Sequence, residues 1–98
     1  MSMTVMLTRN VPDRTRGFLA STMLELAPGV YSAPKLSPAV RDRIWQVILD
    51  WHDPTTLNYV CMLWTDKTIA GGQGFSSVGS PPVEIVEVDG LLLSRRLG

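Results

Sequence analysis

The stretch "LTRNVPDRTRG", residues 7–17, joins two kinds of local structure and places three arginines at the joint. The apolar, partly β-branched run "MTVMLT", residues 3–8, leads into it and predicts a first strand that is buried on both faces. Asn10 then stands where a helix N-cap is expected, with Pro12 in the first turn and Asp13 in a capping-box position. We therefore expect a strand that runs directly into a helix.

The segments that follow alternate between helical and extended patterns. The first helix is expected over residues 11–26, and residues 29–32 form a short strand candidate. Ser37 and Pro38 predict the start of a second helix, whose apolar positions keep helical spacing as far as Trp51. Each helix is therefore expected to connect two strands.

Extended patterns dominate the second half of the chain. Residues 57–65 predict the longest strand, which we expect to be central, and residues 75–79 predict its partner. The two apolar runs after Pro82 are separated by Asp89-Gly90, a strong signal for a tight turn.

This order of elements predicts an α+β protein: a ferredoxin-like sandwich with two helices on an antiparallel sheet, and an appended C-terminal strand pair. A chain of 98 residues makes a single domain. Within it we expect residues 1–80 to form the ferredoxin-like core and residues 81–98 to be an appendage that lends strands to a partner.

The composition favours a partner chain. Apolar residues make up 45% of the sequence and the mean hydropathy is +0.13, which is high for a small chain with few interior positions. We expect part of this apolar surface to face another chain. The three tryptophans suit an interface or the core equally, and Trp45, off the apolar stripe of the second helix, is the interface candidate.

The charges balance overall but not along the chain. The net charge is zero, so no global basic field draws the protein to nucleic acid. Residues 1–49 carry six Lys/Arg against three Asp/Glu, whereas residues 50–98 carry three against six. The two halves could therefore bind different partners, or pair with each other in a dimer.

Common catalytic and metal patterns have little support in this sequence. The single histidine, His52, is interpreted as a helix-end residue, and the single cysteine, Cys61, as core packing in a reducing compartment. One His and one Cys are too few for a zinc site. The nearest carboxylate cluster, Asp50, Asp53 and Asp66, is more typical of solvated caps than of a magnesium site. The sequence has no apolar stretch of membrane-spanning length and no signal-peptide core, which predicts a cytoplasmic protein without a membrane partner.

The opening stretch is the best candidate for binding chemistry. A helix N-terminus offers free N–H groups and a partial positive charge, and phosphates bind there readily. Arg14 and Arg16 would add guanidinium donors that match phosphate geometry and contact a nucleic-acid backbone without reading its sequence. The alternative is a pair of surface arginines, one of them bridging to Asp13.

The linear pattern extends this hypothesis. Residues 10–45, "NVPDRTRGFLASTMLELAPGVYSAPKLSPAVRDRIW", followed by "VEVDGLLL", residues 86–93, closely resemble the CRISPR-associated protein 2 family in its type I-E form. The resemblance covers almost the whole chain. Its most specific pieces are Asn10-Val11-Pro12, Arg14-x-Arg16-Gly17, Leu24-Glu25, Gly29-Val30-Tyr31, Ile44-Trp45 and Asp89-Gly90-Leu91.

This resemblance implies a subunit of CRISPR adaptation, the spacer acquisition step of antiviral defence. It implies a ferredoxin-like homodimer that bridges two dimers of the CRISPR integrase and holds double-stranded foreign DNA. Arginines matching Arg14 and Arg16 contact the DNA backbone in the family, and Arg9 and Asn10 are further DNA-binding candidates. The C-terminal strands would contact the integrase through Val83, Ile85, Val86, Val88, Leu91, Leu92 and Leu93.

One departure from the family pattern bears on catalysis. Family members often carry an acidic residue at the end of the first strand, proposed to hold a metal, but the matching position here is Arg9, which would repel one. We therefore expect a non-catalytic scaffold with no catalytic residue, no metal site and no required cofactor. The alternative is a magnesium-dependent endonuclease acting on RNA or DNA, with Asn10 and an acid from the dimer partner holding the metal. A third possibility is a dimeric structural module with no nucleic-acid role.

Overall fold

The structure is a computed structural model, and it describes residues 2–80 and 84–95. Both α-helices lie in the first 51 residues, and mainly strands follow. In chain order the elements are β1 (Ser2–Arg9), α1 (Asp13–Thr22), β2 (Leu24–Ala27), β3 (Val30–Leu36), α2 (Pro38–Trp51), β4 (Tyr59–Thr65), the 3₁₀ turn η1 (Ala70–Gly72), β5 (Gln73–Gly79), β6 (Glu84–Val88) and β7 (Leu91–Arg95).

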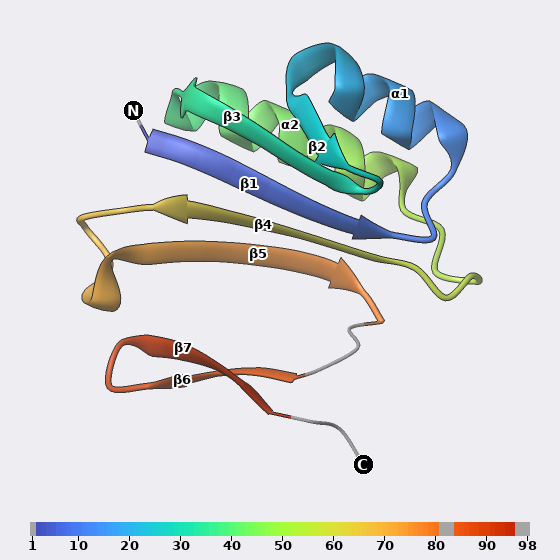
Figure 1. Ribbon diagram of the computed structural model, residues 1–98. Helices are drawn as coiled ribbons and strands as arrows, with labels where there is room; N and C mark the ends of the chain where they lie inside the picture. Colours follow the sequence, from blue (N-terminus) through green and yellow to red (C-terminus); the bar gives the residue numbers. More distant parts are fainter. Residues whose placement is uncertain (1, 81–83, 96–98) are drawn as a thin grey trace.

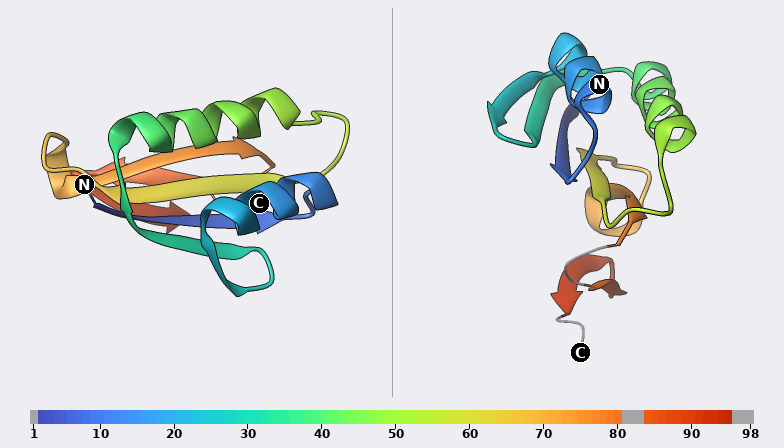
Figure 2. Two further views of the ribbon diagram at one scale, coloured as in Figure 1. Left: turned by 90° about the horizontal axis from the view of Figure 1, so that it is seen from above. Right: turned by 90° about the vertical axis from the view of Figure 1, so that its right-hand side faces the viewer.

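The five N-terminal strands form one sheet in the order β2-β3-β1-β4-β5. Every neighbouring pair in this sheet is antiparallel. The helix α1 connects β1 to β2 and α2 connects β3 to β4, and both helices cover the same face (Figure 1, Figure 2). This is the ferredoxin-like α+β layout, so the predicted fold class is confirmed. The strand β4 lies inside the sheet as expected, but the middle position belongs to β1.

The hydrophobic core lies between the helices and one face of the sheet. Met6 of β1 is directly opposite Met62 of β4 and Tyr31 of β3, so these three side chains share the helix-facing side. Leu19 of α1 and Ile48 of α2 close over them, and all five are almost completely buried. Burying each large apolar side chain contributes about 1.5–3 kcal/mol, which makes this layer the main source of stability.

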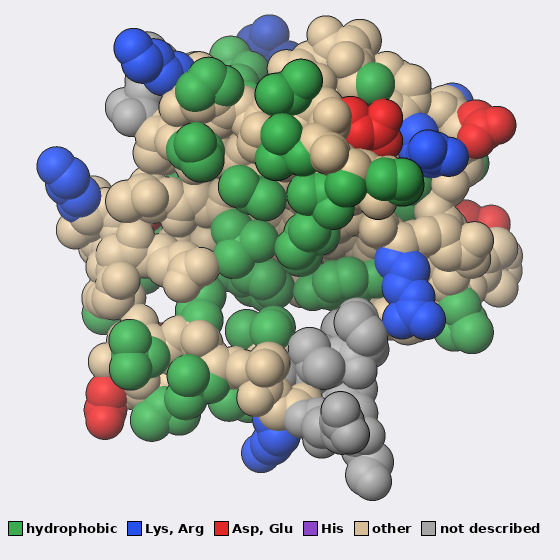
Figure 3. Space-filling view, viewed as in Figure 1, with side chains coloured by type: hydrophobic (Ala, Val, Ile, Leu, Met, Phe, Trp, Pro, Cys, Tyr) green, Lys and Arg blue, Asp and Glu red, His purple; other side chains and the backbone are tan. Residues whose placement is uncertain are grey.

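The opposite face of the sheet carries no helix. Because successive side chains of a strand point to opposite faces, Leu7 lies on this open face next to the buried Met6, and its side chain is exposed. The prediction that the first strand is buried on both faces is therefore wrong for the described chain. Antiparallel sheets commonly have one open face, and here both crossover helices pack on the other. Figure 3 shows apolar side chains gathered over the middle of this face, with charged side chains towards its margins.

The first helix is shorter than predicted. It ends at Thr22, because Met23 adopts an extended conformation (φ −138°, ψ 163°) and its N–H caps the helix by donating to the Leu19 carbonyl. The following residues, which the sequence placed in the helix, form β2 and pair with β3. Pairing in the sheet thus overrides the helical pattern of the last predicted turn. The strand candidate at residues 29–32 is also longer, since β3 runs to Leu36.

The helix α2 begins and ends where the sequence predicts. Ser37 is its N-cap, with the hydroxyl accepting a hydrogen bond from the Val40 N–H at 3.2 Å, and Pro38 occupies the first helical position. Trp45 is half-buried and packs against the hydrophobic core, which favours the core interpretation of this tryptophan.

The strands β6 and β7 form a separate two-stranded sheet, which lies beyond β5 (Figure 1). Asp89 (φ 52°) and Gly90 (φ 83°) make the tight turn between them, as predicted. The backbone of this turn lies against η1: a Cβ added to Gly71 would be 1.7 Å from the Gly90 carbonyl oxygen. The division into a core over residues 1–80 and an appendage over residues 81–98 stays a prediction. Among the described residues, no helix has the length and apolar character needed to cross a membrane.

Candidate nucleic-acid interface

The strand–helix junction follows the end of β1 and is tied to a second loop. Asn10 is left-handed (φ 57°) and donates a hydrogen bond from Nδ2 to the Leu57 carbonyl oxygen at 2.6 Å. The N-cap of α1 is Pro12 rather than Asn10, which corrects the predicted cap. The Pro12 carbonyl accepts hydrogen bonds from the N–H groups of Thr15 and Arg16. Asn10 therefore fixes the path of the chain into the helix instead of capping it.

Arg14 leaves the first turn of α1 towards α2. Its guanidinium carbon lies 4.4 Å from the ring centroid of Trp51, at the end of α2. Phe18 meets the same indole edge-on, with the ring centroids 5.6 Å apart and an interplanar angle of 69°. A cation–π contact holds the guanidinium plane without using its N–H donors, which stay available to an anion.

Arg16 leaves α1 on the other flank, towards β2. Its Nη2 lies 3.9 Å from Oε2 of Glu25, and the two side chains are 48% and 35% exposed. This separation is too long for a hydrogen bond, so the contact is an electrostatic one between half-exposed groups. The structure places Arg16 against Glu25, and no ion pair between Asp13 and either arginine is found in the described chain. The two arginines therefore flank one helical turn instead of lying side by side.

Glu25 has further neighbours that sequence reasoning missed. It is directly opposite Tyr31 in the β2–β3 ladder, and its Oε2 accepts a hydrogen bond from the Gly29 N–H at 3.4 Å. The Tyr31 hydroxyl is buried and has no hydrogen-bond partner of normal geometry among the described residues. Burial raises the pKa of Tyr31, the Glu25 carboxylate raises it further, and Arg16 acts in the opposite direction. Arg16, Glu25 and Tyr31 thus form one charged cluster over the edge of the sheet.

Arg9 lies at the end of β1, the position at which members of the family that the sequence resembles often carry an acidic residue. It is exposed and lines a surface hollow together with Asn10, Leu57, Asn58 and Ser80. A magnesium site needs several oxygen ligands, above all carboxylates. The residues that line this hollow include no carboxylate. In residues 2–80 and 84–95 no group of three or more His, Cys, Asp or Glu side chains could hold a metal ion.

Two of the three candidate carboxylates cap their own loops. Asp53 accepts hydrogen bonds from the N–H and hydroxyl of Thr55, at 2.9 and 2.6 Å, and these bonds lower the pKa of Asp53. Asp66 accepts the same pair of bonds from Thr68, which lower the pKa of Asp66. Asp53 precedes β4 and Asp66 follows it, so the strand separates them. The interpretation of these two acids as caps is confirmed; Asp53 is exposed and Asp66 is half-buried.

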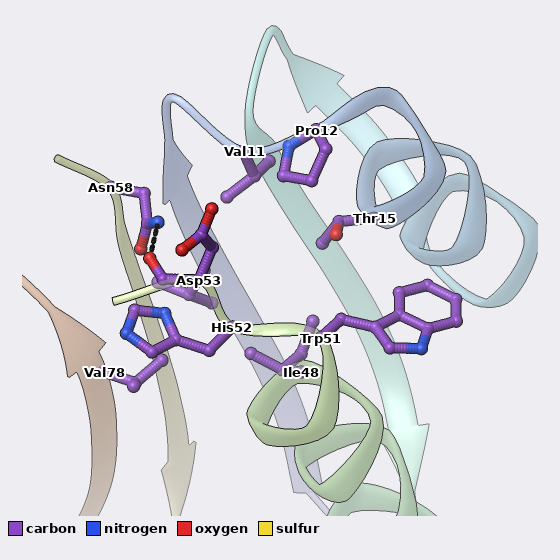
Figure 4. A pocket seen from close by; sticks show the side chains of 10 residues that line it. Val11, Pro12, Thr15, Ile48, Trp51, His52, Asp53, Asn58 and Val78 are labelled. Atoms are coloured by element: carbon purple, nitrogen blue, oxygen red, sulfur yellow. Dashed lines mark hydrogen bonds between the residues drawn. The ribbon is translucent and has the colours of Figure 1, made fainter. Parts of the chain in front are cut away.

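A small, mostly apolar cavity lies between the start of α1, the end of α2 and the strands β4 and β5 (Figure 4). His52 lines it and is the C-cap residue of α2, with its N–H donating to the Leu49 carbonyl, so its prediction as a helix-end residue is confirmed. Asn58 Nδ2 donates to the Asp53 carbonyl and to Thr56 Oγ1. The lining of this cavity includes no serine or cysteine, the usual nucleophiles of acyl transfer.

A second arginine is stacked on a tryptophan at the other end of the sheet. The guanidinium carbon of Arg41, in the first turn of α2, lies 4.3 Å from the ring centroid of Trp64 at the end of β4. The Trp64 ring lies so close to the backbone of β5 that a Cβ at Gly74 would be 2.1 Å from its Cε2 atom. Arg41 and Lys67 also line a hollow that Asp66 shares. The sequence pattern gave no signal for this contact, because its two residues lie in different elements.

The fold and the junction together define a small ferredoxin-like protein with cationic side chains spread around the first turn of α1. A family model described as CRISPR-associated protein (Cas_Cas2CT1978) matches residues 3–93. The chain therefore belongs to this Cas2-type family of CRISPR-associated proteins, and its role lies in CRISPR defence. The type I-E assignment within the family stays an expectation.

Proposed function

We propose that this protein is the scaffold subunit of CRISPR adaptation: a homodimer that bridges two integrase dimers and binds the backbone of captured duplex DNA. The observation that carries the proposal is the arrangement of Arg14 and Arg16 on the two flanks of the first turn of α1. The Trp51 indole orients the Arg14 guanidinium through a contact that uses none of its N–H donors. Arg16 is half-exposed, with its Nη2 atom 3.9 Å from the Glu25 carboxylate.

Two arginines on opposite flanks suit contacts with separate phosphates. A pair aimed at one point would favour a single anion, whereas spread cations follow a polyanion. Such contacts fix the position of a duplex and carry no sequence information. Arg9 and Asn10, on the approach to α1, are the next candidates along the same surface. This is the chemistry required for holding foreign DNA of any sequence.

The open face of the sheet supports the homodimer. Its exposed apolar side chains include Met3 and Leu7 of β1, and Leu24 and Leu26 of the edge strand β2 are 64% and 61% exposed. A contiguous apolar surface of this kind on a small protein marks an interaction site. Because the middle of this face is apolar, with charged side chains towards its margins, we infer that a second copy of the same sheet covers it.

The C-terminal hairpin supports the integrase contact. Val88 is paired with Leu91, and Val86 with Leu93, so these four side chains share one face of the hairpin. Val88, Leu91 and Leu93 are 49%, 61% and 48% exposed. The strands β6 and β7 pair with each other in the described chain, which leaves their outer edges for a partner. The remaining candidates are Ile85 and Leu92, which are half-buried, and Val83, which lies outside the described residues.

The proposal is tested with labelled duplex DNA that has splayed ends, incubated with the purified protein and magnesium, with and without the integrase. We expect a complex on a native gel that is lost or strongly weakened in the Arg14→Ala/Arg16→Ala variant. Each lost phosphate contact should lower the log–log salt slope by about one unit. The matched control is Arg43→Ala/Lys67→Ala, which removes two exposed positive charges elsewhere. Equal slopes for both double variants would overturn the DNA contact.

A denaturing gel of the same samples tests the endonuclease alternative. The hollow at Arg9 has no carboxylate in its lining that could bind magnesium. If the protein is a scaffold, we expect the DNA strands to stay intact. Strand cleavage that requires magnesium, follows the purified protein and is lost in Asn10→Ala would replace the scaffold with a nuclease. The absence of DNA binding in every arm would favour a structural module instead.

A further inference from the structure

We propose that Glu25 competes with DNA for Arg16, so that its carboxylate limits how tightly the protein holds a duplex. The inference rests on the proposed DNA-binding function. It assigns to Glu25 the role of weakening one of the two main DNA contacts, the one made by Arg16. The carboxylate stands in for a phosphate when no DNA is bound, and a DNA phosphate must displace Arg16 from it.

The position of Glu25 is set by the fold and not by Arg16 alone. The residue lies on β2 directly opposite Tyr31, on the side of the sheet that α1 covers. The Gly29 N–H, in the turn before β3, donates to its Oε2 atom. Gly29 is in turn fixed to β1, because its carbonyl accepts hydrogen bonds from the N–H and hydroxyl of Thr8. The carboxylate therefore keeps its place when the guanidinium moves.

The contact with Arg16 is weak enough to be exchanged. At 3.9 Å the two groups attract each other electrostatically but form no hydrogen bond. A phosphate oxygen would form charge-assisted hydrogen bonds of about 2.7–2.9 Å with the same guanidinium, and bidentate ones where geometry allows. A phosphate therefore replaces Glu25 as the partner of the Arg16 N–H groups. The Glu25 carboxylate remains nearby and repels the bound phosphate.

Arg14 and Arg16 consequently differ in the charge of the side chain that each one contacts. Arg14 is held by the neutral indole of Trp51, which offers a phosphate no competition. Arg16 is held by an anion, so part of the attraction that it could offer to DNA is already used within the protein. The carboxylate of Glu25 therefore makes a duplex that contacts Arg16 bind less tightly than it would without that negative charge.

The test compares Glu25→Gln with the wild-type protein in DNA-binding titrations at several salt concentrations. Removing one screened charge beside a phosphate should tighten binding about threefold to tenfold at low salt, and less at high salt. Glu87→Gln is the matched control, because it makes the same chemical change on an exposed residue of the hairpin. We expect the gain from Glu25→Gln to disappear in an Arg16→Ala background.

Three results would overturn the proposal. Weaker binding by Glu25→Gln would mean that the carboxylate orients Arg16 for DNA. An effect equal to that of Glu87→Gln would mean that only the net charge of the protein matters. If Glu25→Gln still tightened DNA binding in an Arg16→Ala background, Glu25 would not compete with DNA for Arg16. Failure of the DNA contact itself is distinguishable, since Arg14→Ala/Arg16→Ala would then bind DNA like the wild type.

A readout without DNA shows whether the cluster exists in solution. The absorbance change of tyrosine ionisation is followed with pH in a Tyr59→Phe background, so that Tyr31 alone reports. Because the Glu25 carboxylate raises the pKa of Tyr31, Glu25→Gln should let Tyr31 ionise at lower pH. An unchanged titration curve with a folded variant would remove the structural basis of the proposal.

Discussion

The guanidinium of Arg14 lies over the indole of Trp51, and this contact joins the first turn of α1 to the last turn of α2. It gives a DNA-binding candidate a fixed direction by means of a neutral aromatic surface.

Replacing Trp51 should weaken DNA binding without removing any charge. In Trp51→Leu the cation–π contact of about 0.5–2 kcal/mol is lost, so the DNA affinity should fall severalfold. Trp45→Leu is the control, because Trp45 packs against the core and no arginine stacks on it in the described chain. Both variants should lose thermal stability, but only Trp51→Leu should lose affinity in fluorescence anisotropy titrations.

A charge on the open face of the sheet should separate the protomers of the proposed dimer. Leu7 on that face and Leu49 on α2 are exposed to the same degree, 40% and 39%. We expect Leu7→Asp to give a monomer in sedimentation analysis, because an unpaired carboxylate is costly in an apolar interface. Leu49→Asp, with the same change in charge, should leave the oligomeric state unaltered. A dimeric Leu7→Asp protein would place the interface elsewhere.

Two glycine-to-alanine changes should affect stability in opposite directions. A Cβ at Gly74 would overlap the Trp64 ring, so Gly74→Ala should lower the free energy of unfolding by about 1–3 kcal/mol. Gly17 lies inside α1, and a Cβ added there would point into open space beyond its own helix. Gly17→Ala should therefore raise the free energy of unfolding by about 0.5–1 kcal/mol, because alanine has a higher helix propensity than glycine. Urea denaturation of the two variants measures both effects.

Alkaline pH should destabilise the fold through Tyr31. Its pKa is raised in the folded protein, first by burial and then by Glu25, above the ordinary value of 10.0. The unfolded chain therefore loses this proton first, and the free energy of unfolding should fall as the pH rises above 10 towards the folded pKa. In Tyr31→Phe this part of the fall should be absent, and denaturation curves between neutral and alkaline pH provide the measurement. Tyr59 has a raised pKa as well, so Tyr59→Phe is the companion variant.

The parts of the fold that depend on local chemistry were predictable from the sequence. Ser37 followed by Pro38 predicts a helix start without any knowledge of the fold, because the capping hydroxyl and the fixed φ angle are properties of those two residues. Asp89-Gly90 likewise carries its own turn. Residues 24–26 are wrongly predicted to be helical, because their conformation depends on pairing with β3, which no local pattern reveals.

The candidate site divides in the same way. Arg14 and Arg16 were identified from the helix start, which is a local signal. Their partners were not, because Trp51 and Glu25 approach them only when the elements pack together. Asp13, the nearest acid in sequence, was the obvious partner on spacing alone, and the sheet brings a more distant acid closer. A long-range contact between two side chains needs the fold before it can be named.

The short connection between β5 and β6 limits how far the C-terminal hairpin can lie from the five-stranded sheet. Only four residues separate the end of β5 at Gly79 from the start of β6 at Glu84, and a fully extended chain of that length spans at most about 14 Å. A partner that docks on the hairpin would therefore be tethered to the β5 edge of the sheet on which α1, the helix of Arg14 and Arg16, packs. In a symmetric pair of chains, two such tethers would hold two partners at a set separation, and the span of DNA between them would be measured by the width of the protein itself.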